Sequence, residues 1–586
     1  MTQNQSNQKN KFRNSIIILL SIIGLITCIA VLFPQIRQMI MDFGKQILHR
    51  KLSTTYQLWF EVIRSYAMGG ICFILFFDYC TLTNSGRILV QRVKQEIKEC
   101  LSEINFRSLV VPLLLMFGVY LLGILTIIRA NFSYLDDFTY SILGHREWLN
   151  WSRYMVVFLS YFVQPEIRLT DISPIPQLLA AFILSCSSVL LVYILGNRRI
   201  TTVRLLASIP MGLSPFFLEC LSYKYSSPYM ALSILTCIVP FLFVARKKAF
   251  IFCSIVSLMI MCMIYQIAAG IYLLIVVMLC FQYWNNREKS YKEILSFFGI
   301  SAFAFCFAML IYKFFFVIPR VDNYTSTTML PFSHIVTGVL NNIKNYALTV
   351  ISDLSMIWKI GIALVMFFFI TKSIYQSAQG KLLSSIVSIL VIVLSFILSY
   401  GIYSLLETPS YAPRALLQFG VFLAILCIYV VSDYKKIAIV VVLALNWCFL
   451  TFAFSYGNAL ADQARYAEFR IGILLHDLSV LYPDQSREGL PIQLKNSIDY
   501  TPSIENTAKN YPVIKRLVPK RLEGDTYWGY YYFLEHFNYS HSSMASIPNV
   551  SGNYIDFSTL DLPVVLDSYY HTIQSDGTRI LVVLKH

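Results

Sequence analysis

Two adjacent carboxylates, Asp136 and Asp137, come directly after a long apolar segment, and they are the side chains best suited to chemistry. Carboxylates at the end of an apolar segment are costly unless water, a partner or a reaction stabilises them. When two of them share a restricted site their titrations separate, and one stays available as a general base. A solvated loop start with an Asp–Arg pair explains the same dipeptide without catalysis, so both interpretations stay open.

Later polar residues lie at the edges of apolar segments and supply cations, hydroxyls, an amide and a carboxylate. In chain order they are Arg153, Glu219, Tyr223, Lys224, Tyr265, Gln266 and Arg414. Each one alone is also typical of an anchor at the membrane–water interface, where Tyr, Arg and Lys place their polar ends. If they share one side of the membrane, they form a pocket where an anionic phosphate binds beside a group that loses a proton.

The elements that must position these residues are membrane-spanning helices. Hydrophobic residues make up 57% of the 586 and charged residues 13%, whereas soluble domains carry about 25% charged residues. A span needs roughly 20 mostly apolar residues, so the run at 249–284 predicts two helices with a tight turn at Tyr265-Gln266. The sequence predicts an all-α polytopic membrane protein with thirteen spans, at 15–34, 66–82, 108–128, 174–196, 203–220, 228–245, 249–264, 267–283, 294–318, 355–371, 382–405, 416–433 and 437–455.

The distribution of charge predicts how the chain is oriented in the cell membrane. The net charge is +15, yet residues 456–586 hold eleven basic and fourteen acidic residues, so the basic excess lies before them. It gathers in short loops, which favours cytoplasmic anchoring and argues against nucleic-acid binding. A cytoplasmic N-terminus and thirteen spans place 456–586 outside. One loop disagrees, because it would carry its charges outside, either in an amphipathic interfacial helix or beside a misassigned span; its residues are Arg37, Lys45, Arg50 and Lys51.

Three regions are expected: N-terminal spans and a cytoplasmic loop at 1–107, a membrane-embedded catalytic core at 108–455, and an extracytoplasmic domain at 456–586. Helical periodicity at 459–481 and a terminal strand at 578–585, after the Asp576-Gly577 turn, make this last domain a small α/β unit. An aromatic run at 527–533 either packs in that domain or against the membrane, or guides a glycan. The thirteen cysteines lie mostly in apolar runs, and no Cys/His spacing predicts a metal site.

Four groups of residues resemble motifs of the serotype-converting type II glucosyl transferases, which are polytopic bacterial membrane enzymes. They are Asp136-Asp137 followed by Gly144, Trp148 and Arg153, the segment 214–225, Tyr265-Gln266, and the segment 456–463. The resemblance covers roughly residues 108–481, with the motifs in order and on one predicted side. Two spans precede the matching part, and the residue after the acidic pair is Phe138, which offers the site no polar group.

The resemblance implies a membrane glycosyltransferase of the C-type fold. Such enzymes take a sugar, usually glucose, from a polyprenyl-phosphate donor and pass it to a surface polysaccharide, wall polymer or lipid-linked glycan at the outer face. They usually invert the anomeric carbon. A phosphate leaving group already carries its charge well, so neither a metal nor another cofactor is expected.

The resemblance also implies roles for the residues introduced above. Asp136 or Asp137 would be the general base that removes the proton of the acceptor hydroxyl. The donor phosphate would be bound by Arg414, Lys224 and Arg153, with Arg414 first because a guanidinium grips phosphate in two places. The sugar or the acceptor would be bound by Glu219, Tyr223, Tyr265 and Gln266.

Two other classes of function compete with this one: a lipid-linked sugar transporter or flippase, and a polysaccharide polymerase or non-catalytic scaffold. Transporters usually consist of two related halves with broken apolar segments and charges near the membrane midplane. In this sequence the informative charges gather at one predicted surface, and no repeated half is evident. The pattern therefore favours chemistry at the membrane surface.

Overall fold

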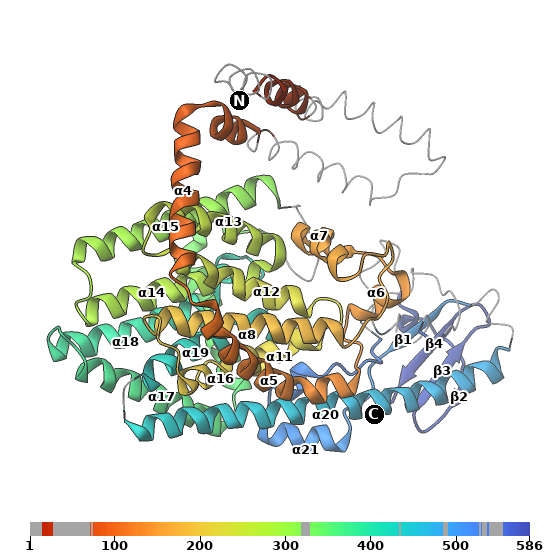
Figure 1. Ribbon diagram of the computed structural model, residues 1–586. Helices are drawn as coiled ribbons and strands as arrows, with labels where there is room; N and C mark the ends of the chain where they lie inside the picture. Colours follow the sequence, from red (N-terminus) through yellow and green to blue (C-terminus); the bar gives the residue numbers. More distant parts are fainter. Residues whose placement is uncertain are drawn as a thin grey trace.

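The protein is described by a computed structural model at residues 14–26, 28, 71, 74–317, 328–432, 435–483, 490–524, 526, 529, 536–537 and 555–585. Within these residues, eight helical stretches are long and apolar enough to cross a membrane, or nine if one bent pair counts as a span. They form a bundle that confirms a multi-pass membrane protein (Figure 1). The eight are α5 (Phe106–Ala130), α8 (Ile175–Leu195), Lys247–Asn285, α15 (Tyr291–Phe315), α17 (Met356–Tyr375), α18 (Lys381–Leu398), Pro413–Val431 and α20 (Lys436–Leu481).

The predicted number of thirteen spans is not confirmed, because several apolar runs are broken. The run at 203–220 bends by 64° between Thr202–Leu213 and α11 (Pro215–Ser222), where Ser214 is extended and Pro215 starts the new helix. The run at 228–245 divides into α12 (Ser227–Ile238) and a 3-10 turn that contains Pro240. The loop at 37–51, whose basic residues conflict with the predicted orientation, lies outside the described residues. Residues 66–70 and most of the aromatic run at 527–533 also lie outside them.

The chain reverses direction between α13 (Lys247–Tyr265) and α14 (Ala269–Asn285). Tyr265 has an extended backbone, with φ −156° and ψ 94°, and a 3-10 turn follows it. The far ends of both helices meet the same neighbour, because the ring of Phe297 lies 5.6 Å from that of Phe250 in α13 and 5.9 Å from that of Tyr283 in α14. Because one straight helix would separate those ends by roughly 58 Å, the two helices form an open hairpin with Tyr265 at its turn.

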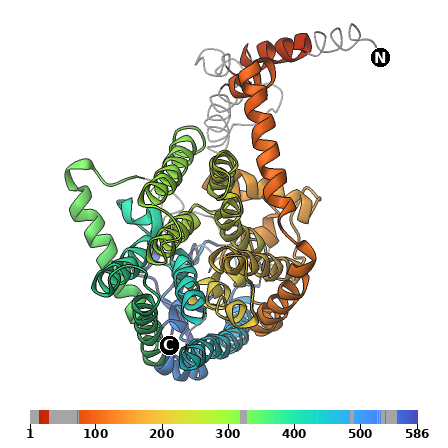
Figure 2. The same ribbon diagram turned by 60° about the vertical axis from the view of Figure 1, so that its left-hand side comes forward.

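The amphipathic helix α4 (Asn84–Ser102) marks one end of the bundle. It lies crosswise to the bundle helices in Figure 1, and Figure 2 shows it projecting away from them. At its C-terminal end Glu99 pairs with Arg246 at 3.1 Å and Glu103 pairs with Arg198 at 2.7 Å. These exposed pairs add little stability, but they bring two of the predicted basic loops to the same end. Helix α5 starts there and carries the chain to the opposite end.

At that opposite end α20 continues past the membrane bundle to a four-stranded sheet (Figure 1). Its 46 residues span roughly 70 Å, more than twice the hydrocarbon core of a bilayer. The expected boundary at 455/456 therefore falls inside a continuous helix. The sheet has the order β1-β4-β3-β2, in which β1 is parallel to β4 and the other pairs are antiparallel; its strands are β1 (Ile492–Lys495), β2 (Val564–Asp567), β3 (His571–Ser575) and β4 (Ile580–Leu584).

The terminal strand predicted from the sequence is confirmed as β4, which follows a turn at Gly577 with φ +82°. In the chain, α21 (Pro502–Asn510) and α22 (Ile514–Leu517) come after β1 and before β2. Both helices pack against the bundle, and Val513 and Leu517 belong to its main hydrophobic core. The C-terminal region thus contributes to the core of the bundle and to a second core, which contains the sheet residues Ile492, Ile573 and Val582. The other described helices are α6 (Asp137–Leu143), α7 (Tyr154–Val163), α9 (Thr202–Leu206), α10 (Pro210–Leu213), α16 (Ile335–Asp353) and α19 (Gln418–Val431).

Candidate active site

The two adjacent carboxylates lie at the end of the bundle that faces the sheet, where α6 begins. Asp137 is fully buried, and its Oδ2 accepts the backbone N–H groups of Tyr134 at 2.8 Å and Lys224 at 3.0 Å. Burial raises the pKa of Asp137 to about 7 from an ordinary value of 3.8, and the two N–H donors oppose this shift. Within the described part of the chain, Oδ1 is buried without a hydrogen-bond partner. Asp137 therefore ties the loop after α5 to the segment after α11.

Asp136 has a different environment, because its side chain is only half-buried. It is close enough to the hydroxyls of Tyr140 and Tyr223 to interact with both electrostatically. Arg153 acts on the same Tyr140 hydroxyl. Of the two carboxylates, Asp136 is the one that a substrate can reach beside a cation.

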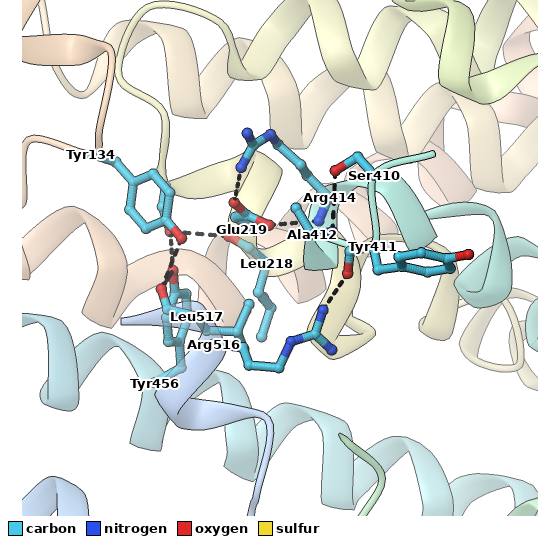
Figure 3. Close-up of polar contacts among 11 residues, drawn as sticks. Tyr134, Leu218, Glu219, Ser410, Tyr411, Ala412, Arg414, Tyr456, Arg516 and Leu517 are labelled. Carbon is cyan, nitrogen blue, oxygen red and sulfur yellow. Dashed lines mark hydrogen bonds and ion pairs between the residues drawn. The ribbon is translucent and has the colours of Figure 1, made fainter. Parts of the chain in front are cut away.

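Glu219 and Arg414 form a buried ion pair at the centre of the site (Figure 3). Glu219 Oε1 accepts from Arg414 Nη1 at 2.5 Å, and Oε2 accepts the Arg414 backbone N–H at 2.5 Å. The Glu219 side chain is 2% exposed and that of Arg414 is 20% exposed. Glu219 lies on α11, which begins directly after the bend at Ser214-Pro215 and whose residues are all buried. The charge of Arg414 is thus offset by Glu219 before any phosphate binds.

Arg153 lies at the start of α7 and is held by aromatic rings. Its guanidinium carbon is 4.7 Å from the centre of the Tyr265 ring and 5.9 Å from that of Trp151. Arg153 and Arg414 are both close enough to Tyr265 to act on its hydroxyl. Within the residues that the structure describes, Arg153 Nε and the Tyr265 hydroxyl are buried without a hydrogen-bond partner. The Nε atom of Arg153 and the Tyr265 hydroxyl, which lies near both arginines, are therefore available to a ligand.

Lys224 and Gln266 make contacts of another kind. The Lys224 ammonium is 5% exposed and pairs with Asp171 at 2.8 Å, away from the Glu219–Arg414 pair. The Gln266 amide donates to the Trp151 carbonyl at 3.2 Å and to the Tyr312 hydroxyl, so it joins the α13–α14 turn to α15. The structure therefore brings seven of the nine predicted residues together around one site and gives Lys224 and Gln266 protein partners at its edge; the seven are Asp136, Asp137, Arg153, Glu219, Tyr223, Tyr265 and Arg414.

Sequence reasoning missed a contribution from the C-terminal region. The carbonyl of Leu517 accepts the hydroxyls of Tyr134 at 2.8 Å and Tyr456 at 3.3 Å. The neighbouring Arg516 donates to the Tyr411 carbonyl (Figure 3). Arg516 also pairs with Asp353. This segment thus contacts the loop before Asp136 and the loop before Arg414. No local pattern reveals such contacts, because the partners are 61 to 383 residues apart in the chain.

No group of three or more His, Cys, Asp or Glu side chains suited to a metal ion occurs among the described residues.

A sequence model of the family described as Glucosyl transferase GtrII matches residues 125–431, which is just over half of the chain. The match contains every site residue predicted from the sequence and ends before α20 and the sheet. No curated protein and no solved structure matches the chain.

Proposed function

Because this chain belongs to the GtrII family of glucosyl transferases, we propose that it transfers glucose from a polyprenyl-phosphate donor to a glycan or wall polymer. The reaction would take place at the extracytoplasmic face, with the N-terminus cytoplasmic and the sheet-bearing C-terminal region outside. The observation that carries this proposal concerns Arg153 Nε and the Tyr265 hydroxyl, which lie beside the half-buried Asp136 and have no hydrogen-bond partner among the described residues. A sugar phosphate supplies both an anion for the first and hydroxyls for the second.

In this mechanism Asp136 removes the proton of the acceptor hydroxyl while the hydroxyl oxygen attacks the anomeric carbon. The bond between that carbon and the phosphate oxygen breaks, and its electron pair leaves with the polyprenyl phosphate. Attack opposite the leaving group inverts the anomeric centre. Positioned general-base assistance contributes roughly 10²- to 10⁴-fold to the rate.

The cations stabilise the charge that develops on the leaving phosphate. Arg153 is the first candidate, because aromatic rings hold it and its Nε has no partner within the described part of the chain. Arg414 assists, although Glu219 already offsets part of its field. Tyr223 and Tyr265 bind sugar hydroxyls, while Lys224 and Gln266 hold the walls of the site.

Asp136→Asn tests the proposal against the alternative that Asp137 is the base. The purified variant is given polyprenyl-phosphate [¹⁴C]glucose and a glycan acceptor in detergent micelles. We expect the rate of transfer to fall about 10²-fold or more. The unfolding temperature should not change, because the Asp136 side chain is only half-buried. The matched control is Asp561→Asn, which removes an exposed carboxylate from the C-terminal region and should leave the rate unchanged.

Three results would contradict this proposal. If Asp136→Asn transfers glucose at the wild-type rate, Asp136 is not the base. If the wild-type protein moves the lipid-linked sugar across a vesicle membrane without forming a glycosidic bond, the activity is that of a flippase. Joining of repeating units without use of the glucosyl donor would indicate a polymerase.

A further inference from the structure

A cavity of about 240 Å³ lies beside the site and is not used by the mechanism above. It is enclosed by the C-terminal end of α5, the N-terminal end of α8 and the segment after α11. Its volume lies just below the roughly 300–1,000 Å³ range of pockets for drug-sized ligands, so it suits a single compact group. Its lining consists of Ile127, Ile128, Asn131, Phe132, Ser173, Pro174, Gln177, Ser222 and Lys224.

The amide of Gln177 is the unusual feature of this lining. The residue is 4% exposed, and its Oε1 is buried with no hydrogen-bond partner among the described residues. Buried polar side-chain atoms nearly always have a partner, and each exception requires an explanation. A side-chain amide both donates and accepts, so a ligand with hydroxyl groups satisfies it in either direction.

The charge in the cavity wall is already balanced. Lys224 contributes a cation that is 5% exposed, and Asp171 neutralises it at 2.8 Å. Asp171 also accepts from the backbone N–H of Ser173 at 2.9 Å and from the Ser173 hydroxyl at 2.5 Å. A phosphate or carboxylate would have to compete with Asp171 for Lys224, so the wall favours a neutral ligand.

The apolar part of the lining completes the recognition chemistry. Phe132 presents an aromatic ring whose cation partner, Arg521, lies 3.9 Å from the ring centre. Ile127 and Pro174 add aliphatic surface. An aromatic ring, amides and a neutralised ion pair together match a pyranose, which has C–H faces and a rim of hydroxyl groups.

We propose that this cavity binds one neutral sugar residue of the acceptor glycan, an inference that rests on the proposed transferase function. The cavity adjoins the site through Lys224, whose backbone N–H is bonded to Asp137 and whose side chain lines the cavity. An acceptor sugar held there is next to the loop that carries Asp136. The donor phosphate binds elsewhere, because the cations that face it are Arg153 and Arg414.

The first experiment measures sugar binding without any donor. Methyl glycosides of common hexoses are added to the detergent-solubilised protein, and binding is followed by saturation-transfer NMR. We expect one or more of them to bind the wild type, and Gln177→Leu to weaken binding about five- to tenfold, as expected for one neutral hydrogen bond. Gln282→Leu is the matched control, since it removes a glutamine that bonds to the Leu195 carbonyl at the opposite end of the bundle.

The second experiment measures steady-state transfer from polyprenyl-phosphate glucose. Gln177→Leu should raise the KM for the acceptor about five- to tenfold and leave the KM for the donor unchanged. Gln177→Asn, which keeps the amide but shortens its reach, gives an intermediate KM and covers the case in which leucine disturbs folding. Unchanged glycoside binding and unchanged acceptor KM in both variants would overturn the sugar subsite. Failure of glucose transfer alone would overturn the proposed function, because glycoside binding is measured without the donor.

Discussion

Two buried acids at the same end of the bundle, Asp137 and Glu219, are stabilised in different ways. Glu219 faces a guanidinium and accepts both a side-chain and a backbone hydrogen bond from Arg414. Among the residues that the structure describes, Asp137 has no cation bonded to its carboxylate oxygens and accepts only the backbone N–H groups of Tyr134 and Lys224. Glu219 neutralises the guanidinium of Arg414, whereas Asp137 connects two segments of backbone. We therefore propose that Asp137 stabilises the backbone around the site, whereas Asp136 acts on the substrate.

Removing Glu219 should produce the largest loss of stability. Glu219→Ala leaves Arg414 without its partner in a largely buried position, and breaking a buried ion pair costs about 3–5 kcal/mol. Equilibrium unfolding in mixed micelles measures this cost. Glu103→Ala is the matched control, because it breaks an exposed arginine–carboxylate pair with Arg198, which is worth roughly 0–1 kcal/mol. A loss for Glu219→Ala no larger than that of the control would contradict the charge-pair assignment.

Asp137→Asn should cost less and should change how stability depends on pH. The asparagine oxygen still accepts both N–H groups, but its NH₂ replaces Oδ1 in a position without a partner in the described part of the chain. An unsatisfied buried donor costs about 1–3 kcal/mol. Since the proposed mechanism uses Asp136 as the base, the folded fraction of this variant should keep most of its activity.

The pH dependence follows from the raised pKa of Asp137. The folded state holds this proton up to about pH 7, whereas an ordinary aspartate loses it near 3.8. The stabilising contribution is therefore fully present below pH 3.8 and is lost as the pH rises through 7. Unfolding temperatures between pH 5 and pH 8 should show the wild type losing its advantage over Asp137→Asn. A constant difference over this range would show that Asp137 does not titrate there.

The sequence could predict which residues gather at this end, but not how the two acids differ. Apolar runs and basic loops place Asp136, Tyr223, Tyr265 and Arg414 at the edges of successive segments, because span length and charge are local properties. The partner of Glu219 is 195 residues away in the chain. Which aspartate is buried depends on a backbone N–H that is 87 residues away. Such contacts depend on helix packing, which carries no signal in one sequence.

The predicted number of thirteen spans is not confirmed, for a related reason. Mean hydropathy over a window counts the run at 203–220 as one straight helix, although Pro215 starts a new helix at an angle of 64°. Helix α11, which follows the bend, is buried at every residue and carries the Glu219 that pairs with Arg414. The bend that interrupts this predicted span therefore directly precedes the helix that supplies Glu219 to the site.

Arg516 offers the smallest and most specific test, because Asp353 is a third buried acid and its partner comes from outside the family match. The Asp353 side chain is 4% exposed and that of Arg516 is 32% exposed, and burial raises the pKa of Asp353 to about 6. At pH 5 the Asp353 carboxyl can therefore take up a proton when Arg516→Ala removes the guanidinium, and we expect the unfolding free energy to fall by only about 1 kcal/mol. The variant also frees the Tyr411 carbonyl, three residues before Arg414. The KM for the donor should therefore rise a few-fold while the KM for the acceptor stays constant.

The neighbouring Lys515 supplies the control for this last prediction. It pairs with Glu505 at 2.8 Å, and both side chains are nearly half exposed, so Lys515→Ala should change neither stability nor donor KM. Arg516→Lys keeps a charge beside Asp353 but loses the second arm of the guanidinium, and it should restore stability more fully than donor KM. If Arg516→Ala and Lys515→Ala change donor KM equally, the C-terminal segment packs on the bundle without positioning the Arg414 loop.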